Sequence, residues 1–470
     1  MESARRWDAD VIGVTDVLIL GAGSAGSIVA AQLSADPDCR VTVIESGPGL
    51  GDPAIRSLID DATVLPIETD SPMVHRYRTQ LTDDPVRDAE IVRGTCIGGS
   101  GAVNGGYFCR ALPADFDGPA VPGWSWAEVE AHYRAIETDL DFPDFGGTGP
   151  IPVSRMREFS SSTATFITAA QQAGYPWLPD VNAAGVGVGA VPLNILDGVR
   201  IGPGVAFLAP ALRRSNLTIL TGTRVTRIRT DRGRVTGIDA IGSQGPIVLD
   251  ANRVVLTAGA IASAHLLLIS GVGPADELAA HGITVVSDLP VGRRCWDHPE
   301  WVMSTGWPAS SGRPVLEAVL VTDDLEIRPY TTGFGGRPQP SIGVALMRPQ
   351  AHGLVSLVSA DPAVPPRISH HYDSESADLA ALQCGSDIIT EILGRTTELG
   401  DPAWSTSQHL CGTAPMGTEG DDYAVVDPHC RVLGVPGLWV IDGSVLRRIP
   451  SRGPHATIAM VGYRAAEFVR

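Results

Sequence analysis

Lysine is absent from this chain of 470 residues, and all 35 basic residues are arginine. A Walker A phosphate-binding loop requires a lysine, and so does a Schiff base with pyridoxal phosphate or a carbonyl substrate. The sequence therefore excludes P-loop nucleotide chemistry and lysine-based covalent catalysis.

Paired cysteines and long apolar runs are also lacking. The seven cysteines contain no CxxC pair, and an odd, scattered set is typical of reduced thiols in a cytoplasmic compartment. Neither an HxxxH pattern nor a Cys/His cluster is present, so we expect no metal site. No apolar run approaches roughly 18 residues, and residues 1–16 do not resemble a secretory signal. We expect a cytoplasmic protein without a transmembrane segment, and peripheral binding at the inner face of the membrane stays open.

The chain length and the net charge limit the number of folded units and the kinds of partner. A chain of 470 residues is too long for one ordinary core, so we expect two or three folded units. The apolar fraction of 44% is that of a globular protein. The net charge of −18 disfavours nucleic acid and anionic membrane surfaces as partners.

A glycine motif lies near the N-terminus. A strand-like run at residues 17–20 leads into the sequence GAGSAG at residues 21–26, and a second run at 41–44 ends at Glu45. A strand, a glycine turn, a helix and a second strand form a βαβ unit that binds a dinucleotide, either NAD or FAD.

Each residue of this motif has a physical role. Gly21 permits the tight turn, Gly23 lets a pyrophosphate approach the backbone, and Gly26 allows close packing of helix on sheet. The helix that begins at Ser24 offers free N–H groups to the phosphates. Glu45 can accept hydrogen bonds from both ribose hydroxyls of an adenosine.

A second glycine-rich stretch favours a flavin over a nicotinamide. Gly98, Gly99 and Ser100, followed by Asn104 and Gly105, combine small side chains with free backbone N–H groups. Such a segment can lie flat against a ring system and donate to its carbonyls. A flexible surface loop is the alternative, but a strand-like lead and an apolar exit flank the stretch.

Two histidines near the C-terminus are the candidates for chemistry. His409 and His455 are each followed by small residues that would let a cofactor or substrate come close. Histidine titrates near neutral pH, so one ring can take an alcohol proton while the other donates a hydrogen bond. His265, by contrast, lies in an apolar helix and is interpreted as a satisfied core histidine.

The rest of the chain alternates between strands and helices. We expect helices near residues 24–34, 127–139 and 375–398, and an apolar helix that ends at Ile269. We expect strands at 217–220, 224–230, 235–240, 247–249 and 254–256. Residues 300–400 show strand-like alternation and are interpreted as part of a different, inserted domain.

Taken together, these segments resemble the GMC (glucose–methanol–choline) family of flavin oxidoreductases. The motifs that carry the resemblance are GAGSAG with VIESG, and residues 94–111, 259–273, 291–299, 409–413 and 442–444. The chain departs from the family's patterns at Thr95, Ala264, Arg294 and Cys295.

The resemblance implies a mixed α/β (α+β) fold, in which a Rossmann-type FAD-binding domain carries an inserted antiparallel-sheet substrate domain. The FAD-binding domain would comprise residues 13–152, 200–298 and 408–470. The substrate domain would comprise residues 153–199 and 299–407, with 1–12 as an N-terminal tail.

The resemblance also implies roles for single residues. His409 would be the active-site histidine and His455 the second catalytic position. The complete set expected at the cofactor is Gly21, Gly23, Ser24, Gly26, Glu45, Gly98, Gly99, Ser100, Asn104, Gly105, Val225, Asp442, Gly443 and Ala456. Some family members attach FAD covalently through a histidine at the position just before Asn104. This chain has Val103 there, so we expect non-covalent FAD.

Three further segments, residues 105–110, 297–301 and 327–334, resemble the mycofactocin-associated branch of the family. This resemblance implies a dehydrogenase that reoxidises reduced mycofactocin (mycofactocinol) and passes electrons to a quinone or another respiratory component. The alternatives are a GMC dehydrogenase or oxidase of a small primary alcohol or sugar, and a non-catalytic flavin-binding electron-relay protein. Arg328 and Tyr330 are candidates for substrate contact, with solvated or core positions equally open.

Overall fold

A parallel sheet lies at the centre of the nucleotide-binding half of the molecule. The computed structural model describes residues 15–117, 121–334, 336–394 and 396–470, so the predicted tail at 1–12 lies outside the described residues. The five strands run in the order β10 (Leu217–Leu220), β2 (Val41–Ile44), β1 (Val17–Leu20), β14 (Val254–Leu256) and β22 (Leu438–Val440). Every neighbouring pair is parallel. All residues of β1, β2 and β14 are buried, as expected for a parallel sheet covered on both faces.

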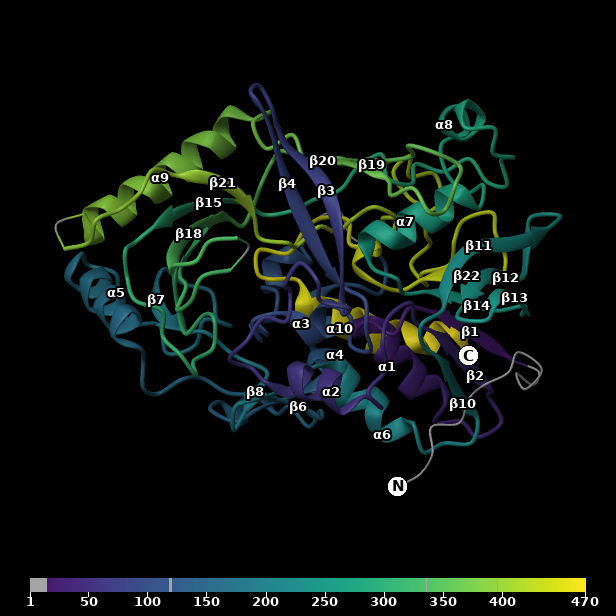
Figure 1. The fold of residues 1–470 in the computed structure, drawn as a ribbon, viewed down its shortest axis with the longest axis horizontal. Coiled ribbons are helices and arrows are strands. Elements are labelled where there is room, and N and C mark those ends of the chain that lie inside the picture. Colours follow the sequence, from purple (N-terminus) through teal and green to yellow (C-terminus); the bar gives the residue numbers. More distant parts are fainter. Residues whose placement is uncertain (1–14, 118–120, 335, 395) are drawn as a thin grey trace.

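Helix α1 (Ser24–Leu33) packs on β1 and β2, and α10 (His455–Ala465) contacts both α1 and α4 (Trp126–Ile136) (Figure 1). Helix α7 (Ala260–Ile269) follows β14 in the chain. The axes of α1 and α10 approach closely, because a Cβ atom on Gly462 would lie 2.9 Å from the Cα atom of Ala25. The predicted helices at 24–34 and up to Ile269 are therefore confirmed.

The helix predicted at 127–139 is wrong over its last three residues. The helix α4 ends at Ile136, and β5 (Glu137–Asp139) pairs in parallel with β6 (Ile151–Val153). Gly149 allows this change, since a Cβ atom there would lie 2.0 Å from the carbonyl carbon of Ile136. The returning chain therefore packs against the backbone where the helix would continue.

Two of the other sheets are antiparallel throughout. The predicted strands after residue 224 form a three-stranded sheet of β11 (Arg224–Asp231), β12 (Arg234–Gly242) and β13 (Gly245–Asp250). A six-stranded sheet has the order β21 (Ala403–Thr406), β15 (Pro299–Ser304), β18 (Ser341–Leu346), β17 (Leu325–Pro329), β16 (Ala318–Val321) and β7 (Gly187–Ala190).

Helices α5 (Ser161–Gln172) and α9 (Ser376–Leu393) cover one face of the six-stranded sheet (Figure 1). The second apolar core lies between these helices and the sheet. The mixed α/β fold with an antiparallel sheet beside a Rossmann-type sheet is confirmed. The helix predicted at 375–398 is present as α9, but it ends at Leu393, before the predicted end. The domain boundaries stay a prediction.

A long hairpin stands between the two halves (Figure 1). Its strands β3 (Val74–Asp83) and β4 (Val86–Gly94) extend a sheet that continues through β20 (Arg367–Ser369) to β19 (Leu354–Ser356). The hairpin thus joins segments that are nearly 300 residues apart in sequence. The remaining elements are α2 (Pro53–Asp60), α3 (Ser100–Val103), α6 (Ala209–Ala211), α8 (Ala275–Ala280), β8 (Ile195–Leu196) and β9 (Val199–Arg200).

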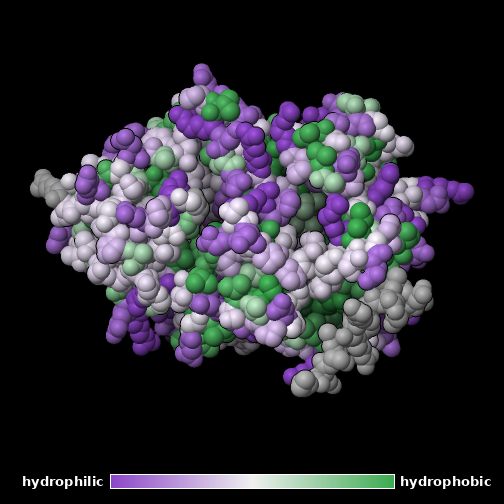
Figure 2. Space-filling model, in the orientation of Figure 1, coloured by the Kyte–Doolittle hydropathy of each residue, from purple (hydrophilic) through white to green (hydrophobic). Residues whose placement is uncertain are grey.

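The surface is mainly polar on the face shown in Figure 2, where hydrophobic residues form several separate groups. Across the described ranges of the chain, we find no helix with both the length and the apolar character needed to cross a bilayer.

Candidate active site

A cavity of about 1700 Å³ is lined by both ends of the chain, by the hairpin and by the six-stranded sheet. Most residues predicted from the sequence lie in its wall, namely Gly21, Gly23, Ser24, Glu45, Gly99, Ser100, Asn104, Gly105, Val225, His409, Asp442, Gly443 and His455. Gly26, Gly98 and Ala456 do not line the cavity. The structure therefore brings the glycine loops and both candidate histidines to one place.

Two glycines of the first loop have different roles: Gly26 is needed for packing within the protein, and Gly23 leaves room for a ligand. A Cβ atom on Gly26 would lie 2.0 Å from the carbonyl oxygen of Gly21, so this glycine is required by the protein itself. A Cβ atom on Gly23 would meet nothing closer than 3.8 Å, and Gly23 lines the cavity. Among the described residues no side chain caps α1, so its first N–H groups remain available to a ligand.

The second glycine loop lies against the first. Gly99 has a φ of +55°, and a Cβ atom there would lie 2.7 Å from the Cα atom of Gly23. The Gly98 N–H donates to the Ala22 carbonyl at 2.8 Å, and the Gly99 N–H donates to the Cys96 carbonyl at 2.8 Å. The expectation that these two N–H groups face a ring system is therefore wrong, because the turn into α3 uses them internally.

Two buried carboxylates hold the glycine turns at the carboxyl ends of the strands. Glu45 accepts hydrogen bonds from the N–H groups of Ala22 (2.8 Å) and Gly47 (3.0 Å). Asp442 accepts from the Gly259 N–H at 2.8 Å and from the Ser263 hydroxyl at 2.6 Å. Burial raises the pKa of both carboxyl groups. This edge of a parallel sheet is where such folds bind ligands.

His409 is fixed by a second histidine that the sequence analysis did not single out. The Nδ1 atoms of His298 and His409 lie 2.8 Å apart, and His298 Nε2 lies 3.1 Å from the Pro450 carbonyl oxygen. Burial lowers the pKa of both rings well below the usual value, so both are neutral at physiological pH. His298 stands in the 291–299 motif, and its place in Asp-His-Pro before a strand was the available signal.

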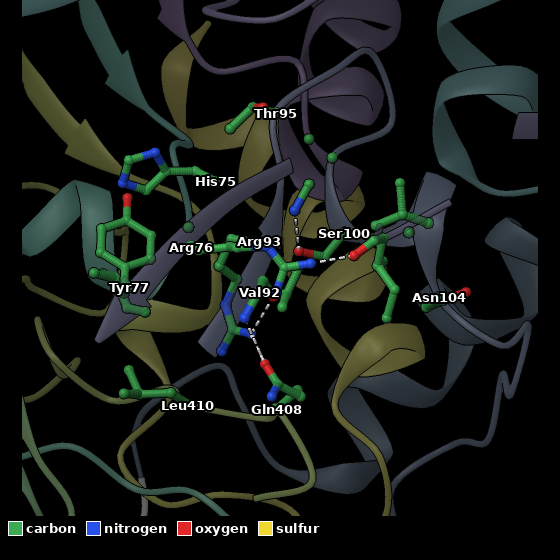
Figure 3. Close-up of a pocket in the computed structure, with 18 of the residues that line it drawn as sticks. His75, Arg76, Tyr77, Val92, Arg93, Thr95, Ser100, Asn104, Gln408 and Leu410 are labelled. Carbon is green, nitrogen blue, oxygen red and sulfur yellow. Dashed lines mark hydrogen bonds between the residues drawn. The ribbon is translucent and has the colours of Figure 1, made fainter. Parts of the chain in front are cut away.

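The loop before His409 is attached to the hairpin. Gln408 has a φ of +66°, an uncommon conformation for a residue other than glycine. Its Oε1 accepts from the Val92 N–H at 2.8 Å (Figure 3). Its Nε2 donates to the Glu90 carbonyl at 3.1 Å. The edge of β4 therefore holds the backbone that positions His409.

His455 faces the glycine loops. Asn104 Oδ1 accepts from the Gly106 N–H at 2.9 Å, so its Nδ2 donates to His455 Nδ1 at 3.1 Å. The other ring nitrogen, Nε2, lies 3.1 Å from the Ser24 hydroxyl. Burial lowers the pKa of His455 to about 4. The neutral ring therefore carries its proton on Nε2.

A buried polar network forms another part of the cavity wall. The Tyr330 hydroxyl donates to Glu300 Oε1 at 2.7 Å, and Arg328 pairs with Glu326 at 2.7 Å. The Ser407 hydroxyl accepts from Arg328 at 2.9 Å and donates to Glu300 at 3.0 Å. Arg328 and Tyr330 are thus buried groups in the cavity wall beside the His409 loop.

His265 is not the satisfied core histidine that we expected. It lines the cavity half-buried, and its Nε2 has no hydrogen-bond partner within the described part of the chain. Burial, and secondarily Arg224, lower its pKa from 6.5 to about 4. The apolar helix predicts burial of this ring but cannot show whether a partner is present.

Replacing His265 by leucine is expected to stabilise the apoprotein selectively in mild acid. As pH falls below 6.5 the unfolded chain binds a proton before the folded one, so this histidine contributes a loss of stability between about pH 6.5 and 4. The unfolding free energy of H265L minus that of wild type should be about 2 kcal/mol larger at pH 5 than at pH 7.5. Urea titrations at both pH values measure this change, and a constant difference would contradict it.

Comparison with known proteins identifies the chain. The family models described as GMC oxidoreductase match residues 15–300 and 349–462. The chain belongs to the GMC oxidoreductase family. A GMC-type oxidoreductase of Rhodococcus erythropolis is 40% identical, over 96% of this chain and 97% of the relative.

Characterised members act on different alcohols. An oxygen-dependent choline dehydrogenase of Brucella ovis is 29% identical, over 97% of this chain and 95% of the relative. The crystal structure of pyridoxine 4-oxidase from Mesorbium loti superposes with a TM-score of 0.86 at 28% identity, over 97% of this chain and 99% of that one. GMC oxidoreductases act on CH–OH donors, so the coarse activity predicted from the sequence is confirmed.

The residues of this GMC oxidoreductase fit the family's cofactor. The predicted FAD is confirmed by the family, and the open side of Gly23, the uncapped α1 and the two glycine loops in contact form a cradle for its phosphates. Non-covalent attachment stays a prediction. Among the described residues we find no cluster of His, Cys, Asp or Glu arranged to hold a metal ion.

Proposed function

We propose that this GMC oxidoreductase oxidises an alcohol, with His409 as the base that takes the hydroxyl proton. The observation that carries the proposal is the half-buried, neutral His409 ring, held at the wall of the cavity that the FAD cradle also lines. Bound FAD supplies the hydride acceptor, so the carbinol carbon loses a hydride and the oxygen loses a proton to give a carbonyl product. A neutral imidazole at this wall can accept that proton.

His455 is proposed to orient the substrate oxygen. Because the Asn104 amide donates to its Nδ1, the ring carries an N–H group at Nε2. This N–H lies 3.1 Å from the Ser24 hydroxyl, and in the proposal it turns from Ser24 to an alkoxide-like oxygen when the substrate binds. The pair therefore divides into an acceptor, His409, and a donor, His455.

For the substrate we propose reduced mycofactocin, with a quinone or another respiratory component as electron acceptor. The support is the resemblance of residues 105–110, 297–301 and 327–334 to the mycofactocin-associated branch, since Tyr107, Glu300 and Arg328 from these segments line the cavity. In this proposal the protein is a cytoplasmic dehydrogenase that delivers electrons at the inner face of the membrane.

A second candidate is the oxidation of a small primary alcohol. The names of the relatives support it, because one is a choline dehydrogenase and a structural neighbour is a pyridoxine oxidase. Both an oxidase and a dehydrogenase occur among these proteins.

Mycofactocinol, choline and simple primary alcohols should be compared as reductants of the bound flavin without oxygen, followed by reoxidation with air or with a quinone. We expect the fastest reduction with mycofactocinol and faster reoxidation by the quinone. Faster reduction by a small alcohol would favour the second candidate, and faster reoxidation by air would make the enzyme an oxidase.

A further inference from the structure

We infer that His298 is a positioning residue that sets the tautomer of His409, leaving His409 Nε2 as an unprotonated base that faces the cavity. This inference rests on the proposed function, because the free base matters only if His409 takes the substrate proton. It starts from two contacts, the 2.8 Å approach of the Nδ1 atoms and the 3.1 Å contact of His298 Nε2 with the Pro450 carbonyl oxygen.

The order of protons follows from the acceptor at one end of this chain of contacts. The Pro450 carbonyl can only accept, so His298 carries a proton on Nε2. A neutral imidazole carries one proton, and His298 Nδ1 is therefore a lone pair. The Nδ1 atom of His409 must then donate. A neutral His409 that donates from Nδ1 has its lone pair on Nε2.

The opposite order requires a charged His298. An imidazolium would donate from both nitrogens and would force His409 to carry its proton on Nε2, which cannot act as a base. His298 has no solvent exposure, and burial together with the nearby Arg328 and Arg452 lowers its pKa. These surroundings keep His298 neutral and favour the productive order.

The Asp297 carboxylate fixes the backbones of both histidines relative to each other. Asp297 Oδ1 accepts from the N–H groups of His298 (2.8 Å) and His409 (2.7 Å), and its Oδ2 accepts from the Thr406 hydroxyl (2.6 Å). One carboxylate therefore fixes the spacing between two segments that are 111 residues apart. This arrangement maintains the contact between the Nδ1 atoms of the two rings.

The free nitrogen of His409 points toward an open position. A Cβ atom on Gly453 would lie 3.7 Å from His409 Nε2, and both residues line the cavity. With glycine at this position no side chain covers the Nε2 edge from that direction. The tautomer set by His298 thus places the lone pair where a substrate hydroxyl can reach it.

Two substitutions distinguish the hydrogen-bond acceptor of His298 from the space that its ring fills. In H298F the ring remains but the acceptor is lost, whereas in H298N the amide Oδ1 can take the place of Nδ1. We expect H298F to slow flavin reduction by the alcohol roughly 10²–10⁴-fold, with the dissociation constant of the alcohol changed less than about threefold. H298N should recover most of the lost rate.

A direct readout is the ¹⁵N spectrum of the histidine-labelled holoenzyme, with the His409 signals assigned from their loss in H409A. We expect wild type and H298N to carry the proton of His409 on Nδ1, and H298F to shift it to Nε2. A wild-type His409 protonated on Nε2 would overturn the inference, and so would equal rates and spectra for H298F and H298N. If H298F does not fold, the spectra of wild type and H298N decide alone.

The spectrum also separates this inference from the proposed function. A wild-type enzyme that shows the Nδ1-protonated ring yet oxidises no alcohol would contradict the function and leave the positioning relation intact. An active enzyme with the other tautomer would contradict only the positioning.

Discussion

Replacing His409 by alanine is expected to leave FAD bound and to slow the anaerobic reduction of the flavin by an alcohol roughly 10²–10⁴-fold. The alanine removes the only group that we place as acceptor of the hydroxyl proton, while the glycine cradle and the carboxylates that hold it stay unchanged. Rapid mixing of the holoenzyme with substrate, followed by flavin absorbance, measures the rate.

The matched control is His281→Ala. This histidine follows α8 and does not line the cavity, so its loss should leave the reduction rate at the wild-type value. Reduction of H409A as fast as that of wild type would remove His409 from the mechanism. Loss of FAD from H409A would instead show that the residue holds the cofactor.

Replacing Gly23 by alanine is expected to weaken FAD binding about 10- to 100-fold while the free energy of unfolding of the apoprotein changes little. Gly23 has a φ of −68°, which any residue adopts, and its Cβ atom would find no protein atom closer than 3.8 Å. The methyl group would occupy the side from which the pyrophosphate approaches the N–H groups of α1. Each lost charge-assisted hydrogen bond costs about 1.5–3 kcal/mol, and about 1.4 kcal/mol is tenfold in affinity.

Gly26 supplies the contrasting variant. Its Cβ atom would clash with the Gly21 carbonyl at 2.0 Å, so G26A should destabilise the apoprotein itself. Titration of each apoprotein with FAD and unfolding without FAD distinguish the two effects. Wild-type FAD affinity in G23A would contradict the placement of the pyrophosphate at this loop.

The nucleotide-binding half was predictable because its signals are local. The glycines, the apolar strands on either side and Glu45 lie within 29 residues, and each role depends on neighbours close in sequence. The strands from 217 to 256 and the helix after them are continuous apolar or alternating runs. Their backbone geometry follows from these patterns with little help from the rest of the molecule.

The neighbours of His409 were not predictable in this way. His298 reaches His409 because β15 pairs with β21 in a register that sets Pro299 opposite Thr406. Gln408 adopts a positive φ because a side-chain bond to β4 holds it. Both effects depend on the pairing of segments more than 100 residues apart, and no local pattern encodes a register over that distance.

The central claim is that both ends of the chain build one site in which an alcohol gives its hydride to FAD and its proton to His409. The most direct test mixes the purified yellow holoenzyme with mycofactocinol and simple alcohols in the absence of oxygen. We expect at least one of these alcohols to bleach the flavin and to yield one equivalent of carbonyl product. A flavin that stays oxidised with every alcohol, yet is reduced by dithionite, would contradict this role of the site.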